Sequence, residues 1–206
     1  MLNNTTAENI LQAAERLFLE RGFAMTSTTD IAREVGCNQA LVYYYYRSKE
    51  QLFNSIFTNK MRMLLVNCRR ILESQAVFED KVRAFIGSYF ELLCHTPRLP
   101  FLIFNELVTN EQRRTQVRER VIADPEVQRV YYAMQDELNR EIDAGRIRPI
   151  DMLDLLLNIM SLTVMNFLVL PMYADFLLKT EEEQRQFLDA RRQEVCQTVL
   201  RSIRNS

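Results

Sequence analysis

Turn-forming residues are scarce in this chain. Its 206 residues include only 4 glycines and 5 prolines. Folds rich in β-strands need many tight turns, and glycine and proline are the residues that most often form them. No stretch alternates polar and apolar residues as a half-buried strand would. The sequence therefore predicts an all-α protein of about nine helices.

Histidine is also nearly absent, since His95 is the only one. A nucleophile activated by a histidine base is therefore hard to assemble. The 4 cysteines have no zinc-like spacing, and no P-loop, dinucleotide fingerprint or HExxH motif is present. We expect no catalytic site, no metal and no cofactor. His95 is expected to be an ordinary helix-end residue, and the cysteines to be free thiols in a cytoplasmic protein.

Neither sign of charge is in excess. The formal net charge is −1 at pH 7, whereas small nucleic-acid-binding domains are often clearly basic. Residues 1–50 carry five basic side chains against six acidic ones. Any DNA-binding function must therefore depend on a local motif, because bulk charge does not favour it.

One long apolar stretch could be a membrane span. Residues 155–174 contain no charged side chain, and about twenty apolar residues are enough to cross a bilayer. Polar residues interrupt this stretch, Pro171 lies near its end, and its flanks are acidic where a membrane helix usually has basic anchors. A helix buried on two sides explains the pattern better, so we expect no membrane association.

Two short helices separated by a tight turn are predicted between residues 27 and 47. The first begins near Thr28 and stops at Gly36, because glycine readily adopts the left-handed conformation that ends helices. Asn38 is a good N-cap for the second helix, which covers residues 39–46. This is the spacing of a helix-turn-helix motif, whose second helix presents its N-terminal residues to base edges in the major groove of DNA.

The second helix of this motif must pack inward on one face and meet DNA on the other. Val42 and Tyr46 are four residues apart and can pack inward. Glutamine can form two hydrogen bonds with adenine, alanine can contact a thymine methyl group, and tyrosine hydroxyls can bind phosphates. The residues available on the DNA-facing side are Gln39, Ala40, Tyr43 and Tyr44.

Lys49 opens the following helix, where a positive charge opposes the helix dipole. A nearby phosphate would explain that placement. Simpler alternatives remain open: Lys49 can be an ordinary solvated side chain, Gln39 an exposed residue without a base contact, and the tyrosines part of an aromatic core. A purely core role is the hardest to accept, since four consecutive helical residues cannot all face one way.

The N-terminal quarter resembles the DNA-binding domain of the TetR family. The resemblance is carried by Thr-Thr-Asp-Ile-Ala-Arg-Glu-Val-Gly at 28–36, by Leu-Val-Tyr-Tyr-Tyr-Tyr-Arg-Ser-Lys-Glu-Gln-Leu-Phe at 41–53, and by an upstream run beginning at Ile10. It covers about residues 6–55. It implies a helix-turn-helix DNA-binding domain over residues 1–50 and a helical effector-binding and dimerisation domain over residues 51–206.

The same resemblance implies roles for individual residues. Thr28 and Thr29 open the helix that flanks the groove. Gln39, Ala40 and Tyr43 occupy positions that read bases or nearby phosphates, and Tyr44 and Lys49 occupy positions that bind the DNA backbone. The predicted DNA-binding residues are therefore Thr28, Thr29, Gln39, Ala40, Tyr43, Tyr44 and Lys49.

The resemblance implies that the C-terminal part is a helical body that dimerises and binds an effector, and the pattern of its last two helices agrees with this in outline. The helix predicted after Pro149 is apolar nearly all round, so its own core can cover one side and a partner subunit the other. The last helix, opened by Thr180, could join it in a four-helix interface. We therefore expect a homodimer through the last two helices, which matches a palindromic operator read through paired half-sites.

Aromatic and methionine side chains in this body suggest a pocket for a small, mainly apolar effector. Such side chains are more often simple core, and that alternative stays open. By resemblance, the effector would favour a form of the dimer in which the distance between the two DNA-binding domains does not match the operator. A repressor in that form is released from DNA. The expected pocket residues are Phe85, Tyr89, Phe90, Phe101, Phe104, Tyr131, Met134 and Met165.

Two other classes of function compete with a DNA-binding regulator. An enzyme is disfavoured because no catalytic set of residues can be identified. A helical interaction module whose helix-turn-helix no longer binds DNA is supported only by the neutral charge balance. The sequence therefore favours a DNA-binding transcriptional regulator, with the interaction module as the alternative.

Overall fold

A computed structural model describes residues 2–205, and it is built from helices with one isolated antiparallel bridge between Ile147 and Arg204. The described part holds ten α-helices and one short π-helical segment, which confirms the all-α fold class. The helix count exceeds the predicted nine because residues 111–117 form a separate helix, in a polar stretch whose sequence is compatible with either a helix or a loop.

The chain divides into two compact units. The first contains residues up to Met63 together with Phe101–Ile122, and the second contains Leu64–Pro100 and the residues from Ala123 onward. The predicted domain boundary at residue 50 stays a prediction, since compactness alone does not say which unit carries which function. The segment Phe101–Ile122 nevertheless packs with the N-terminal helices, which the sequence did not suggest.

The first unit is assembled around α1 (Leu2–Arg21), α2 (Thr28–Val35) and α3 (Gln39–Tyr46). It also includes the start of α4 (Lys49–Leu72), most of α6, and α7 with the π-helical η1. Apolar side chains at helical spacing on α1 meet those of the other helices in one core. The fully buried members include Ile10, Leu17, Phe18, Ile31, Val42, Leu52, Phe53, Leu102 and Val121.

Local signals end and begin these helices as the sequence predicts. Gly36 ends α2 with a φ of 73°, a left-handed conformation that costs glycine little. The side chain of Asn38 caps α3 by accepting a hydrogen bond from the Leu41 amide. The start of α1 differs from expectation. The pattern Thr5-x-x-Glu8 predicts a capping box that opens this helix, but the helix begins at Leu2, so Thr5 lies inside it and does not cap it.

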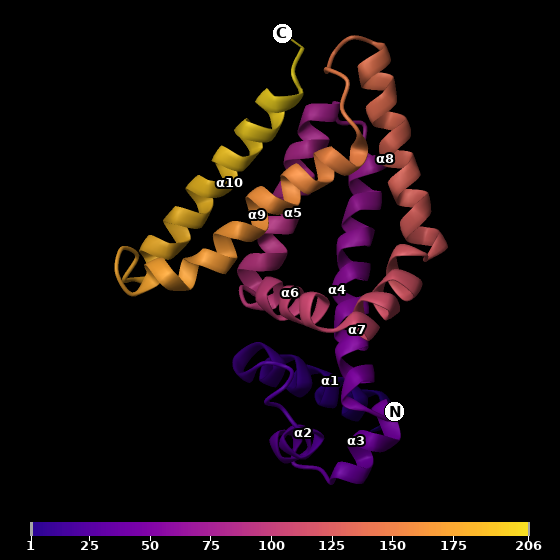
Figure 1. The fold of residues 1–206 in the computed structure, drawn as a ribbon, viewed down its shortest axis with the longest axis vertical. Helices are drawn as coiled ribbons and strands as arrows, with labels where there is room; N and C mark the ends of the chain where they lie inside the picture. The colour runs from indigo at the N-terminus through magenta and orange to yellow at the C-terminus, as the bar shows by residue number, and fades with distance from the viewer. Residues whose placement is uncertain (1, 206) are drawn as a thin grey trace. The chain divides into compact units, whose positions relative to one another are not determined.

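The second unit contains α5 (Phe78–His95), α8 (Pro125–Asp143), α9 (Met152–Ala174) and α10 (Glu181–Ile203), together with the end of α4. Helices α5, α9 and α10 pack against one another, and α8 packs against α9 (Figure 1). The remaining bounds are α6 (Leu99–Thr109), α7 (Glu111–Val117) and η1 (Arg118–Ile122).

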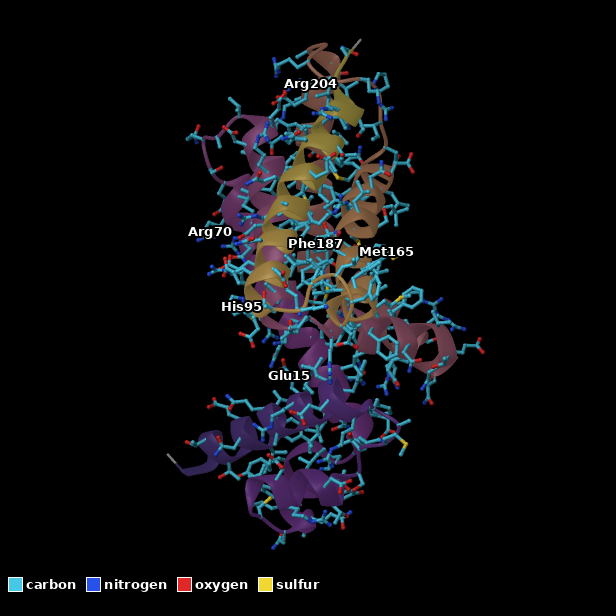
Figure 2. The ribbon with its side chains drawn as sticks, turned by 90° about the vertical axis from the view of Figure 1, so that its left-hand side faces the viewer. Glu15, Arg70, His95, Met165, Phe187 and Arg204 are labelled. Atoms are coloured by element: carbon cyan, nitrogen blue, oxygen red, sulfur yellow. The ribbon has the colours of Figure 1, made fainter. Side chains whose placement is uncertain are left out.

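Helix α9 is long and apolar enough, by composition, to cross a membrane, and most of its length is not buried within the chain. One side packs into the core through Leu155, Ile159 and Phe167. The opposite side exposes apolar residues. Met165, labelled in Figure 2, is 57% exposed. We expected both sides of this helix to be buried. Within a single chain only one side is buried, and the other is exposed.

Candidate functional site

The α2–α3 motif is fixed by reciprocal hydrogen bonds at the start of α2. The Ser27 hydroxyl accepts from the Asp30 amide at 3.1 Å, and the Asp30 carboxylate accepts from the Ser27 amide at 3.0 Å. The Ser27 hydroxyl and the Ser27 amide both donate to the Asp30 carboxylate, and these two bonds hold the pKa of Asp30 below its ordinary value. This capping box fixes the point at which α2 begins.

Helix α3 has a buried and an exposed face, as the sequence predicts. Val42 is buried, and the Tyr46 hydroxyl donates a 3.0 Å hydrogen bond to the Ala7 carbonyl of α1. Tyr43 and Tyr44 are 61% and 62% exposed. Each of these rings has an apolar body and a polar hydroxyl, so this side of α3 presents both aromatic surface and hydrogen-bonding groups. Helix α3 is thus anchored from one side, and its tyrosines are presented on the other.

Gln39 and Thr28 link the two helices of the motif. The Gln39 side-chain amide donates to the Thr28 hydroxyl at 2.9 Å. Gln39, Ala40 and Thr29 are exposed, while Thr28 is half-buried. The bond holds the first side chain of α3 over the start of α2. It therefore limits the rotamers that the Gln39 side chain can adopt.

Lys49 has partners within the chain. Its Nζ donates to the Phe23 carbonyl at 2.9 Å and lies 4.3 Å from the centre of the Phe23 ring. The side chain is half-buried. These contacts join the start of α4 to the loop after α1, so they supply a structural reason for a lysine here. The expected phosphate contact of Lys49 stays a prediction.

Arg113 is a buried residue that the sequence analysis missed. It lies on α7 and is only 2% exposed, whereas the polar composition of residues 110–120 predicts an exposed segment. Its Nη1 donates to the Asn54 Oδ1 at 3.0 Å, and its guanidinium lies within 3.5 Å of the Glu106 carboxylate. Burial lowers the pKa of Arg113. A buried ion pair leaves no periodic apolar pattern in the sequence, so the burial of Arg113 could not be predicted.

The second unit contains a small apolar cavity of about 50 Å³. It lies among the last turns of α4, the first turns of α5 and α9, and the middle of α8. Two predicted pocket residues, Phe85 and Met134, line it. The full lining consists of Cys68, Ile71, Leu72, Phe78, Lys81, Val82, Phe85, Met134, Glu137, Met152, Leu155, Leu156 and Ile159.

The other predicted pocket residues do not line this cavity. Phe90 is buried in the core, 5.8 Å from Phe167 between ring centres, and Tyr89 and Tyr131 are half-buried against the same core. Phe101 and Phe104 are 66% and 62% exposed, as residues of the first unit. Met165 is also exposed. These residues were predicted to line a pocket because they are aromatic or methionine, and residue type alone does not indicate where a side chain points.

One ion pair lies on the cavity wall. The Lys81 Nζ donates to the Glu137 Oε1 at 2.7 Å and to the Leu72 carbonyl at 2.9 Å. The two charged side chains are 12% and 17% exposed. The pair therefore joins α5 to α8 and to the last turn of α4 in a largely dry setting, where electrostatic interactions are stronger than at a surface.

The cysteines and the single histidine show no catalytic arrangement. All four cysteines are free. Burial raises the pKa of Cys68, which lines the cavity, to about 11. His95 is the last residue of α5, as expected, and its Nδ1 lies 2.8 Å from the Glu91 carbonyl (Figure 2). Within the part of the chain that the structure describes, no three His, Cys, Asp or Glu side chains are grouped to hold a metal.

The sequence and the fold both match known proteins. A sequence model described as "Bacterial regulatory proteins, tetR family" matches residues 10–56. The uncharacterized HTH-type transcriptional regulator YfiR of Bacillus subtilis (strain 168) is 31% identical over 149 residues, which cover 68% of this chain and 67% of the relative.

A second relative and a solved structure agree with these matches. The fatty acid metabolism regulator protein of Bacillus subtilis (strain 168) is 24% identical over 140 residues, 68% of this chain and 69% of that one. The structure of the transcriptional regulator FadR from Bacillus subtilis in complex with stearoyl-CoA superposes with a TM-score of 0.69 at 18% identity, covering 95% of this chain and 98% of that one. The fold is therefore shared over nearly the whole length.

These matches extend the local resemblance of residues 6–55 to most of the chain. They set it among transcriptional regulators and not among enzymes. The interaction module without a DNA-binding role is not favoured, since the exposed face of α3 is intact. The chain belongs to the TetR family of bacterial regulatory proteins, and it is a DNA-binding transcriptional regulator of the helix-turn-helix type.

Proposed function

We propose that this regulator is a cytoplasmic repressor that binds a palindromic operator as a homodimer and is released by a small, mainly apolar effector. The outward face of α3 carries the proposal. Gln39, Ala40, Tyr43 and Tyr44 are exposed together on a helix whose other side is anchored by the buried Val42. A helix held in this way can enter the major groove without rearranging the unit to which it belongs.

In this proposal residues 1–50 contact DNA and residues 51–206 bind the effector and the second subunit. Thr28, Thr29 and Lys49 bind the DNA backbone beside α3. Lys49 would keep its bond to the Phe23 carbonyl while a second proton of its ammonium group meets a phosphate, because lysine has three donors. The segment Phe101–Ile122 supports the DNA-binding helices from within their own compact unit.

An exposed apolar row on α9 supports the homodimer. Leu153, Leu157 and Met160 follow one another at helical spacing and are 54%, 53% and 46% exposed. Contiguous apolar surface of this kind usually marks an interface. In a two-fold dimer the row would meet the same row of a second copy, and α10 would lie beside it.

The cavity of the second unit supports an apolar effector. Its lining is almost entirely aliphatic, aromatic and methionine side chains. FadR, whose fold this chain shares, was solved with stearoyl-CoA, a molecule with a long acyl chain. Helix α4 supplies the last-turn residues Cys68, Ile71 and Leu72 to the cavity and begins among the DNA-binding helices at Lys49. We propose that effector binding moves α4 and that this movement changes the distance between the two DNA-binding domains of the dimer.

Selection of binding sites from random DNA duplexes by the purified protein tests the proposal. We expect one palindrome to be enriched, because a two-fold dimer reads two equivalent half-sites. Tyr43→Ala and Gln39→Ala should lose that enrichment. Tyr132→Ala and Gln128→Ala are matched controls, since both residues are exposed on α8 and should select the same palindrome as the unmodified chain.

Three other results would overturn parts of the proposal. If no DNA sequence is enriched at any salt concentration, the protein does not bind a specific operator. Enrichment of a single unrepeated site would contradict a two-fold dimer. Enrichment that survives both α3 substitutions would move the base-reading surface away from α3.

A further inference from the structure

The apolar cavity has one charged pair in its wall, and the two members of the pair are held differently. Lys81 is on α5, which buries Val82, Ile86, Phe90 and Leu93 in the core. Its Nζ also donates to the Leu72 carbonyl, one of the carbonyls left without a helical partner at the end of α4. Lys81 is therefore fixed by its helix and by a second acceptor.

Glu137 is the less firmly held member. Its carboxylate has Lys81 as its ion-pair partner. It lies on α8, which buries only Val130 and Leu138 fully along its length. The other ion pair from α8 to α4, Glu126 with Arg69, is exposed and 3.4 Å long, so it adds little. The nearby Glu141 is already paired with Arg146 at 2.6 Å. Of the two groups, Glu137 is the one that can leave.

The cavity must enlarge before it can take a ligand. Its volume is about 50 Å³, whereas pockets that hold small molecules measure roughly 300–1,000 Å³. Met134 of α8 lines the cavity beside Glu137, and methionine repacks easily. Outward movement of α8 would enlarge the cavity, but that movement also separates Glu137 from Lys81. A buried ammonium group left without its carboxylate is strongly unfavourable.

We propose that the cavity binds an amphipathic molecule with one apolar chain and one anionic group, and that the anionic group replaces Glu137 on Lys81. This inference rests on the proposed function and names the chemical class of its effector. The apolar chain fills the space opened by Met134 and α8. The anionic oxygen accepts the hydrogen bond from Lys81 Nζ that Glu137 gives up, so the lysine stays paired while α8 is released.

The same geometry disfavours neutral and cationic ligands. A neutral ligand would open the cavity and leave Lys81 with only the Leu72 carbonyl, which does not neutralise its charge. A cationic ligand would have to pair with Glu137 and leave Lys81 without a counter-charge in a dry wall. We call the Lys81–Glu137 ion pair the latch, because it joins α5 to α8 until an anionic head group replaces Glu137.

Isothermal titration calorimetry of the full chain tests this inference, with dodecanoate and dodecylamine below their micelle concentrations and dodecan-1-ol below its solubility limit. The three probes have the same chain and differ in head group. We expect dodecanoate to bind roughly ten- to a hundredfold more tightly than dodecan-1-ol, the range for one hydrogen bond to a charged group. Dodecylamine should bind most weakly.

Substitutions at the latch separate its two members. Lys81→Met should remove the preference for dodecanoate over dodecan-1-ol, and Lys81→Arg should retain it. Glu137→Gln should tighten dodecanoate binding, because the competing carboxylate is gone. Lys60→Met is the matched control: Lys60 forms a 2.6 Å pair with Glu15 whose side chains are similarly shielded, at 17% and 23% exposed, in the first unit. It should leave the preference unchanged.

The outcomes distinguish the inference from the proposed function. Equal binding of dodecanoate and dodecan-1-ol, no binding of either, or an unchanged preference in both Lys81→Met and Glu137→Gln would overturn the anion-selective latch, even if the chain selects a palindrome. Failure to select any DNA would overturn the repressor role, while a lysine-dependent preference for dodecanoate would still support the latch.

Discussion

The guanidinium carbon of Arg113 lies 4.3 Å from the centre of the Phe53 ring. The same group lies 4.9 Å from the Phe23 ring and pairs with the buried Glu106. Arg113 thus places a charge beside two aromatic rings in the core of the first unit, and these contacts connect α7 to α4 and to the loop after α1. Cation–π contacts strengthen when the cation is removed from water.

We expect Arg113→Met to destabilise the chain by about 3 kcal/mol, the lower end of the range for breaking a buried ion pair. Methionine fills much of the same space but leaves the Glu106 carboxylate buried without its partner. Urea unfolding followed by circular dichroism measures the change. The double variant Arg113→Met with Glu106→Gln should recover part of the loss. Arg118→Met, an exposed neighbour, should stay close to the unmodified chain, and equal losses in Arg113→Met and Arg118→Met would contradict a specific role for the buried charge.

Lys49 should contribute to DNA affinity without contributing to sequence preference. If it binds a phosphate in each subunit, Lys49→Met should lower the slope of log affinity against log salt by about 1.8 per dimer, because each lost phosphate contact lowers it by about 0.9. Fluorescence anisotropy with the selected operator and with an unrelated duplex gives both slopes. A salt slope that does not change, accompanied by a lower melting temperature, would show instead that Lys49 acts only through the Phe23 carbonyl and ring.

A charge placed in the exposed apolar row of α9 should break the proposed dimer. Leu157→Lys puts an ammonium group where two copies of the row would meet, and a like charge from each subunit would be buried there. We expect monomers in analytical ultracentrifugation and weaker operator binding. Val77→Lys replaces an aliphatic residue that is 67% exposed before α5, and it should leave the dimer intact. A Leu157→Lys variant that sediments like the unmodified chain would place the interface elsewhere.

Cys68 should make stability fall at alkaline pH. Burial raises the pKa of its thiol from 9.0 to about 11. The folded chain therefore keeps the proton more tightly than the unfolded chain, so the stabilisation is complete below pH 9 and is lost as the pH rises toward 11. Two pKa units correspond to an upper limit of about 2.7 kcal/mol. Urea unfolding at several pH values should show a steeper decline for the unmodified chain than for Cys68→Ala, and parallel declines would show that the thiol is not desolvated in solution.

The DNA-binding motif was determined almost entirely by the sequence. Its signals are local: Ser27 and Asn38 cap helices within three residues of themselves, and Gly36 ends α2 where only a left-handed residue fits. The spacing of Val42 and Tyr46 shows which side of α3 packs inward, because side chains four residues apart share a helix face. A contiguous segment of about fifty residues was therefore enough to predict which side of α3 is buried and which is exposed.

The cavity and its latch were decided only by the tertiary structure. Lys81 and Glu137 are 56 residues apart, and no sequence pattern indicates that α5 and α8 bring them together. Arg113 meets Asn54 across 59 residues, within a segment whose polar composition predicts exposure. Phe101 and Phe104 have the composition of pocket residues, yet both are exposed. Periodicity and capping report on a helix and its nearest neighbours, whereas the burial of a charge or a ring depends on which distant helix packs against it.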